Sequence, residues 1–128
     1  MILPSAQNIS ICFPVQPPAN LRHARTVLVV EAPGALRLLE DNTAQPGVVL
    51  THMRMLNPRM LTQVAPDAII GPLIADGWDG LDLATALEDM GYRGTLFILS
   101  RQLPNAELIL HEMRACCPKL SIALIETP

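Results

Sequence analysis

The chain has 128 residues, enough for one domain with a hydrophobic core and too few for two ordinary domains. Half of the residues are hydrophobic but only four are aromatic, so the core is expected to be aliphatic. The formal net charge is −3, and eight arginines and one lysine are scattered along the chain. Without a clustered positive field, nucleic-acid binding is not expected.

Nothing in the sequence indicates a membrane or a secreted protein. No apolar run reaches the roughly 18 residues that span a bilayer, and the first ten residues lack the basic start of a signal peptide. The cysteines Cys12, Cys116 and Cys117 are odd in number and lack the spacing of a disulfide framework. We therefore expect a cytoplasmic protein that binds neither membrane nor nucleic acid.

The first part of the chain, residues 1–25, is expected to be an extended N-terminal arm. It contains four prolines, whose spacing argues against a helix. It also contains a short β-prone run at residues 9–15. The folded domain is expected to occupy residues 26–128.

From residue 26 onward, short apolar runs alternate with helical patterns. The expected strands are residues 26–30, 47–52, 67–70, 95–100 and 120–126. The expected helices are residues 33–42, 57–65, 80–92 and 105–117. Asn57 and Asn105 are expected to cap the second and the fourth of these helices.

Strands that alternate with helices through short connections predict a parallel sheet with helices on both faces. Five such strands favour a doubly wound, flavodoxin-like α/β fold with strand order 2-1-3-4-5. In such sheets ligands bind at the carboxyl ends of the strands, beside the reversal of strand order. The chain stops directly after the fifth expected strand, so we expect the last helix of the fold to be missing.

The stretch PDAIIGPLIADGWDGLDL, residues 66–83, resembles the receiver domains of two-component response regulators. In these domains the third strand begins with Pro-Asp, and an Asp-Gly-apolar-acidic-apolar motif follows its loop. Pro66, Asp67 and residues 79–83 match this pattern without a gap. The resemblance extends over roughly residues 26–126, and it implies a receiver-like fold and a role in signalling.

The resemblance also indicates where the chemistry of a receiver would lie. In that family an aspartate at the end of the third strand accepts a phosphoryl group, and two acids hold Mg²⁺. A hydroxyl group and a lysine then contact the phosphate. Ungapped matching places Pro72 at the acceptor position, Glu31 and Ala32 at the two acids, and Ser100 at the hydroxyl. The lysine is missing, since Lys119 precedes the fifth strand.

These degenerate positions imply that the chain has no aspartyl phosphorylation, no metal site, no cofactor and no catalytic residue. One alternative is a shift of register that brings Asp76 to the site. Trp78 and Asp79 follow in the same loop and are possible contacts for a partner, although Trp78 could equally pack within the loop. His52 has no acid at a ligand spacing in the sequence, and it is interpreted as a surface residue.

The sequence therefore predicts a degenerate receiver-like domain that acts through protein–protein contacts with a signalling protein, and not an enzyme. The alternative is a small α/β enzyme or ligand-binding domain that uses Glu31, Ser100 and the loop at residues 71–79. A missing last helix would leave apolar faces of the last two strands bare. We therefore expect a homodimer in which the arm and the fifth-strand region take part, with the arm or a second copy as the cover.

Overall fold

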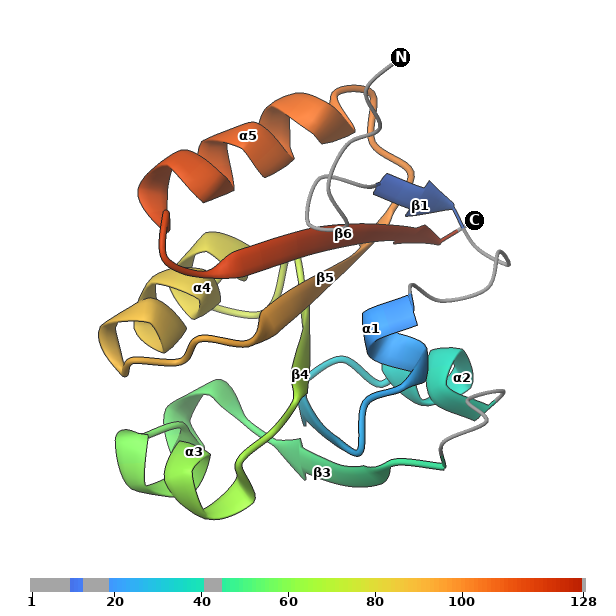
Figure 1. Cartoon of the computed structure of the whole chain (residues 1–128). Coiled ribbons are helices and arrows are strands. Elements are labelled where there is room, and N and C mark those ends of the chain that lie inside the picture. The colour runs from blue at the N-terminus through green and yellow to red at the C-terminus, as the bar shows by residue number, and fades with distance from the viewer. Residues whose placement is uncertain (1–9, 13–18, 41–44, 128) are drawn as a thin grey trace.

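The computed structural model describes residues 10–12, 19–40 and 45–127 (Figure 1). Its strands are β1 (Ser10–Cys12), β2 (Thr26–Val30), β3 (Gly47–Thr51), β4 (Ala68–Pro72), β5 (Thr95–Arg101) and β6 (Ser121–Thr127). Its helices are α1 (Ala19–Arg22), α2 (Ala35–Glu40), the 3₁₀ helix η2 (Met53–Met55), α3 (Pro58–Val64), α4 (Gly80–Asp89) and α5 (Ala106–Cys116). The domain is therefore of the α/β class, as expected.

All the strands are parallel and form one sheet in the order β1-β6-β5-β4-β2-β3. From β2 to β6 this is the expected order 2-1-3-4-5, which is confirmed. The carboxyl ends of β2, β3, β4 and β5 consequently meet at one edge of the sheet. The reversal of strand order lies between β2 and β4.

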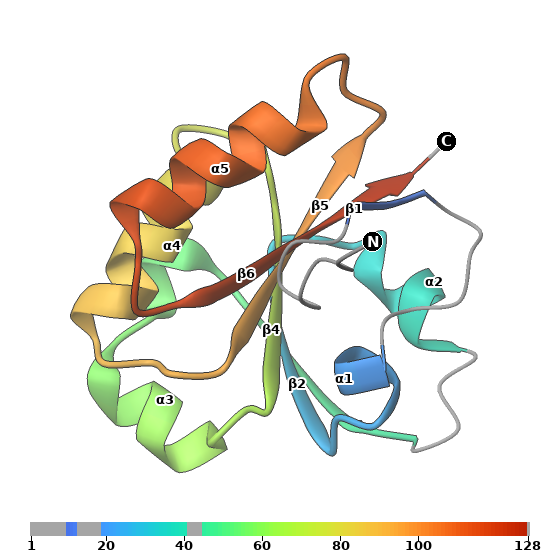
Figure 2. The same cartoon turned by 45° about the horizontal axis from the view of Figure 1, so that its top comes forward.

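Two layers of helices cover the sheet, with α3, α4 and α5 on one face and α1 and α2 on the other (Figures 1 and 2). The helices of each layer pack against the sheet and bury a separate, mostly aliphatic cluster of side chains between helices and strands. The runs of β2, β4 and β5 alternate between the two clusters, which explains why these strands are apolar at successive positions. Within the residues described, no helix has the length and apolar character needed to cross a bilayer.

Of the two expected helix caps, the one at the start of α3 is present and the one at the start of α5 is not. Asn57 caps α3, because the N–H of Met60 donates to its side-chain oxygen at 2.8 Å. Asn105 occupies the same position before α5, but its side chain makes no capping hydrogen bond there. The helix α4 starts with a capping box between Asp79 and Asp82, which the sequence analysis did not foresee.

The segment before β2 contains more regular structure than expected. β1 lies beside β6 in parallel register, with Ile11 opposite Ile125. Ala19–Arg22 form the one-turn helix α1, so the expectation that this segment has no helix is wrong. The helix starts at Ala19, after the last proline of the segment in the sequence, so no proline interrupts its hydrogen bonds.

The face of β5 and β6 that was expected to be bare is covered within the single chain. Phe97, Ala123 and Ile125 are all buried, and they belong to the same cluster as Leu21 of α1. Asn20 of α1 also reaches the start of β5, where its side-chain amide donates to the hydroxyl of Thr95 at 3.5 Å. Of the two covers that the sequence analysis left open, the arm of the same chain is therefore the one observed for these residues.

Candidate functional site

Pro72 ends β4 at the carboxyl edge of the sheet, opposite Leu99 of β5. The next N–H, that of Leu73, donates to the carbonyl of Leu99 at 3.0 Å. Because backbone groups alternate in direction along a strand, the nitrogen of Pro72 faces β2, whose ladder with β4 ends at the pair Val29–Ile70. A proline here therefore removes no hydrogen bond between β4 and β5.

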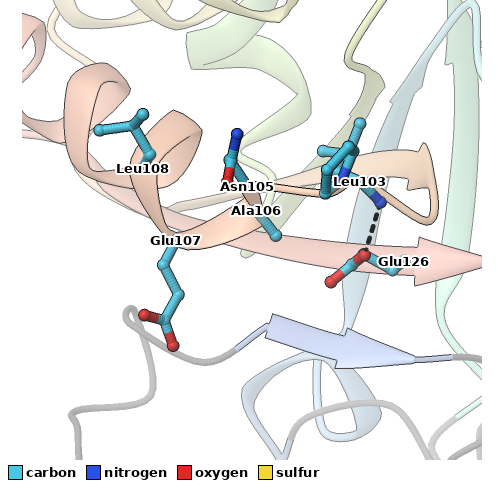
Figure 3. A pocket seen from close by; sticks show the side chains of 7 residues that line it. Leu103, Asn105, Ala106, Glu107, Leu108 and Glu126 are labelled. Atoms are coloured by element: carbon cyan, nitrogen blue, oxygen red, sulfur yellow. Dashed lines mark hydrogen bonds between the residues drawn. The ribbon is translucent and has the colours of Figure 1, made fainter.

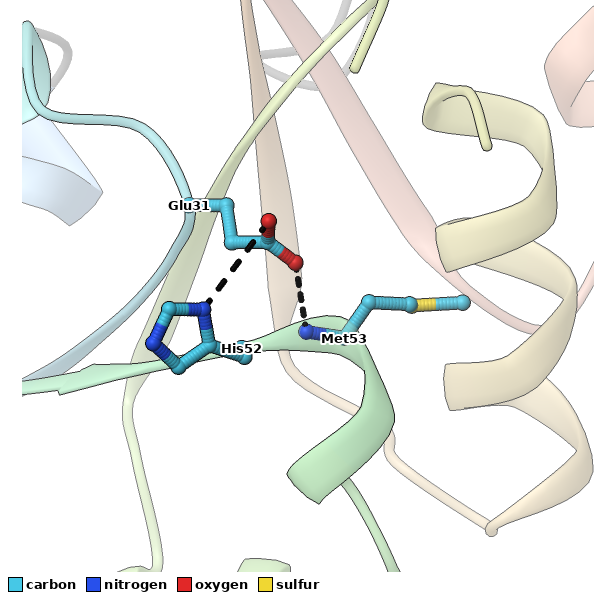
Figure 4. Close-up of polar contacts among 3 residues, drawn as sticks. All are labelled: Glu31, His52 and Met53. Atoms are coloured by element: carbon cyan, nitrogen blue, oxygen red, sulfur yellow. Dashed lines mark hydrogen bonds and ion pairs between the residues drawn. The ribbon is translucent and has the colours of Figure 1, made fainter. Parts of the chain in front are cut away.

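Glu31 lies directly after β2 in the left-handed conformation, with φ of 48°. Its N–H donates to the carbonyl of Thr51 at 3.1 Å, and the N–H of Met53 donates to its Oε2 atom at 2.8 Å (Figure 4). The carboxylate thus satisfies a free N–H at the start of η2 and ties the end of β2 to the end of β3. Ala32, at the position of the second acid, is buried among the side chains under α1 and α2.

His52 has an acidic neighbour in the fold, Glu31, although no acid lies at a ligand spacing from it in the sequence. The Oε1 atom of Glu31 lies 3.9 Å from Nδ1 of His52 (Figure 4). The two residues follow different strands, and they meet because the carboxyl ends of β2 and β3 are adjacent. The His52 side chain is 64% exposed, so water screens this contact and its energy is small.

A groove of about 550 Å³ opens beside this pair. It is lined by Glu31, His52, Met53, Arg54, Asp76, Gly77 and Trp78. The residue considered for a register shift, Asp76, thus shares a groove with Glu31. Pro72 and Ser100 are not among the residues that line it. Among residues 10–12, 19–40 and 45–127, no cluster of three or more His, Cys, Asp or Glu side chains is arranged to hold a metal ion.

Ser100 makes its hydrogen bonds within the β5–β6 region. Its hydroxyl donates to the carbonyl of Arg101 at 2.8 Å, and its own carbonyl accepts from the hydroxyl of Thr127 at 3.1 Å. Ser100 therefore does not line the groove beside Glu31, where a small α/β enzyme that used both residues would need it.

The loop after β4 is a tight hairpin, which we call the 74–79 hairpin. Ile74 and Asp79 form an antiparallel bridge, and the N–H of Ala75 donates to the carbonyl of Trp78 at 3.0 Å. Gly77 turns the chain with a φ of 83°, which favours glycine. Ile74 is held 80% exposed, whereas Trp78 packs partly against the cluster of α3, α4 and α5. The exposure of Ile74 was not expected, although Asp76-Gly77 between apolar residues is a turn signal in the sequence.

The acids that match the receiver pattern hold backbone groups. Asp67 lies at the amino ends of the strands, just before β4. There its Oδ2 atom accepts from the N–H groups of Arg25 at 2.6 Å and Thr26 at 3.2 Å. The carboxylates of Asp79 and Asp82 accept from each other's N–H groups at 2.9 Å. These three acids therefore fix the start of β2 and the start of α4.

A second groove, of about 560 Å³, lies at the start of α5 beside the end of β6 (Figure 3). Glu126 reaches it from β6, and its side chain is nearly buried at 7% exposure. The N–H of Leu103 donates to its Oε2 atom at 2.9 Å, which fixes the connection between β5 and α5. This role of Glu126 was not expected, although an acid at the end of an apolar strand is visible in the sequence.

The adjacent cysteines end α5 without forming a site. Cys117 is buried with its sulfur 3.8 Å from the hydroxyl of Thr85, and burial raises the pKa of its thiol. Cys116 is exposed, and both are free thiols. A buried thiol with a raised pKa is a poor nucleophile.

The chain matches no protein-family model, and no curated protein matches it. Its fold is similar to a two-component response regulator of the LuxR family from Aurantimonas sp. SI85-9A1. That structure is 19% identical with a TM-score of 0.52, covering 80% of this chain and 73% of that chain. A signal receiver domain of an HD domain-containing protein from Pseudomonas fluorescens Pf-5 is 15% identical with a TM-score of 0.49, covering 80% and 76%.

At this level of identity the similarity concerns the fold. The chain has the doubly wound α/β fold of a response-regulator receiver domain, as the resemblance of residues 66–83 implied.

Proposed function

We propose that the chain is a receiver-like signalling module that acts through protein–protein contacts, without phosphorylation of an aspartate and without catalysis. The observation that carries the proposal is Pro72, because β4 ends in a residue without a nucleophile where a receiver needs its acceptor. The two acid positions support it as well. The Glu31 carboxylate is occupied by the N–H of Met53, and Ala32 is part of the core.

The roles of the remaining acids favour the same proposal. Asp67, Asp79 and Asp82 each accept hydrogen bonds from backbone N–H groups that organise the fold. A chain that needs the fold and not the phosphoryl transfer would keep acids with these structural roles and lack the acceptor. In this chain the three acids are present and the acceptor position is a proline.

We place the contact for the protein partner on the 74–79 hairpin, with Ile74 and Trp78 as its apolar residues. The bridge between Ile74 and Asp79 already orders the loop, so binding costs little additional ordering of the backbone. Asp79 was the other residue expected to contact a partner. Its carboxylate caps α4, where it accepts the N–H of Asp82. The partner is proposed to be a cytoplasmic signalling protein, and a second copy of the chain is a further proposed partner.

The proposal is tested by incubating the full chain with acetyl phosphate and Mg²⁺ and measuring its intact mass. The mass is expected to remain unchanged, because Pro72 cannot accept a phosphoryl group. An Asp76→Asn variant serves as the comparison. A gain of one phosphoryl group that disappears in this variant would show that Asp76 is the acceptor, and the proposal would be wrong.

The alternative of an enzyme or a ligand-binding domain is favoured only by the groove beside Glu31, Asp76 and Trp78. Its catalytic version needs Ser100 at the same groove with a base beside it. The hydroxyl of Ser100 donates instead to the carbonyl of Arg101. We therefore retain the signalling module as the proposed function.

A further inference from the structure

The two lateral edges of the sheet, at its outermost strands, differ in whether another strand covers them. The β6 edge is covered by β1 of the same chain, whereas β3 pairs with β2 alone among the described residues. The β3 edge has none of the lysines that commonly block such edges, since residues 45–51 carry no charge. Leu50 is 62% exposed on this edge, and Val48 is exposed too.

The hydrogen bonds of β3 show which of its backbone groups face away from the sheet. The N–H of Gly47 donates to the carbonyl of Arg25 at 2.8 Å, and the carbonyl of Thr51 accepts from Glu31 at 3.1 Å. Residues 47 and 51 therefore direct their backbone groups toward β2, and so does residue 49 between them. The N–H and C=O groups of Val48 and Leu50 face outward.

The outward groups are arranged symmetrically about Val49. In an antiparallel pair of two β3 strands with a two-fold axis at Val49, Val48 of each copy lies opposite Leu50 of the other. This is a hydrogen-bonded pair, in which each residue exchanges its N–H and C=O with the other. All outward groups of Val48 and Leu50 on both copies then find partners, as an isologous interface requires.

The side chains and the charges are compatible with the same register. Val49 packs toward the cluster of α3, α4 and α5, so Val48 and Leu50 lie on the other face and would meet as apolar cross-strand pairs. His52, which follows β3, comes opposite the uncharged Pro46 of the second copy. Like charges therefore do not face each other along the paired strands.

We propose that β3 is a self-association edge, at which two copies pair antiparallel through residues 47–51 and join their sheets. The inference rests on the homodimer part of the proposed function, and it moves the expected contact from the arm and β6 to the opposite edge. An interface of two short strands is smaller than the roughly 1,200 Å² of stable complexes. The dimer is therefore weak and forms at concentrations on the order of 100 µM and above.

The test uses the full chain in sedimentation equilibrium from about 10 µM to about 1 mM, a range that spans weak association. The wild type is expected to dimerise, and Leu50→Lys is expected to weaken the association at least about tenfold, because it places a charge on the paired edge. Leu108→Lys is the matched control, since Leu108 is 55% exposed on α5 and lies outside the edge. It is expected to dimerise as the wild type does.

Amide hydrogen exchange gives a second measurement that a general loss of stability would not mimic. Protection of the Val48 and Leu50 amides is expected to rise with protein concentration, while that of Val49 stays constant. A wild type that is monomeric at 1 mM would overturn the inference.

Ile11→Pro tests the arm instead. If this substitution abolishes association while Leu50→Lys keeps it, the arm forms the interface and the β3 proposal is wrong. Neither result affects the mass test for phosphorylation.

Discussion

Leu83 of α4 occupies the space in which a side chain on Gly71 of β4 would lie, since a Cβ atom at residue 71 would collide with Cδ2 of Leu83. Gly80, at the start of α4, is similarly restricted, because its Cβ would lie 3.2 Å from the carbonyl oxygen of Pro72. The two glycines let α4 approach the end of β4 closely. This approach fixes the position of the 74–79 hairpin that connects them.

Gly71→Ala is therefore expected to destabilise the fold by about 1–3 kcal/mol, the usual cost of overpacking a core. Urea unfolding followed by the fluorescence of the single tryptophan, Trp78, measures the change. Gly34→Ala is the matched control, since a Cβ there would lie 3.4 Å from Cδ2 of Leu99, an ordinary contact. Equal stability of the two variants would contradict the close approach of Leu83 to Gly71.

The capping box at the start of α4 gives a second prediction. Asp79→Ala removes the acceptor for the N–H of Asp82, and it is expected to cost about 1 kcal/mol of unfolding free energy. Asp76→Ala removes the same charge from the same loop without touching the cap, and it is expected to cost much less. If both substitutions cost the same in urea unfolding, the effect is one of charge and not of capping.

The strands β2, β4, β5 and β6 could be predicted from the sequence because they are buried on both faces. The run TVLVV at residues 26–30 is apolar after Thr26, and the structure buries Val27 to Val30. The pairing of β1 with β6 could not be predicted. A strand of three residues finds its partner more than a hundred positions away, and no local pattern specifies which edge it joins.

The candidate site could be predicted only as a set of positions. The end of β2 was located correctly at residue 30, whereas β4 and β5 extend to Pro72 and Arg101, beyond the expected ends at residues 70 and 100. The contacts of Glu31 with Met53 and His52 depend on how neighbouring strand ends turn. The exposure of Ile74 depends on a bridge to Asp79 within a six-residue loop. Such loop geometry is set by packing, which composition and periodicity do not report.

A third prediction concerns divalent metals at the degenerate site. Mg²⁺ and Mn²⁺ are expected to bind only in the millimolar range, because hard cations need several oxygen ligands and the Glu31 carboxylate already accepts the N–H of Met53. Titration with Mn²⁺, followed by broadening of the amide signals of residues 31, 53 and 76, measures this. Broadening confined to these signals at low micromolar Mn²⁺ would show a competent metal site and contradict the prediction.

Tyr92 provides a pH-dependent prediction, because its phenol lies partly buried and donates to the carbonyl of Pro66 at 3.2 Å. Burial, and then the negative charge of Asp67, raises the pKa of this phenol well above its ordinary value of 10.0. The folded state thus favours the neutral phenol. Its stabilising contribution is fully present below pH 10 and is lost as the pH rises beyond it, where the phenol ionises in the unfolded chain.

Tyr92→Phe is accordingly expected to cost about 0.5–1.5 kcal/mol at pH 8, the value of one hydrogen bond. Above pH 10, the wild type is expected to lose this advantage by about 1.4 kcal/mol per pH unit relative to the variant. Because Tyr92 is the single tyrosine of the chain, absorbance of tyrosinate reports it alone. The folded protein should titrate at higher pH than the protein in urea, and coincident titrations would show that the phenol is not held neutral by the fold.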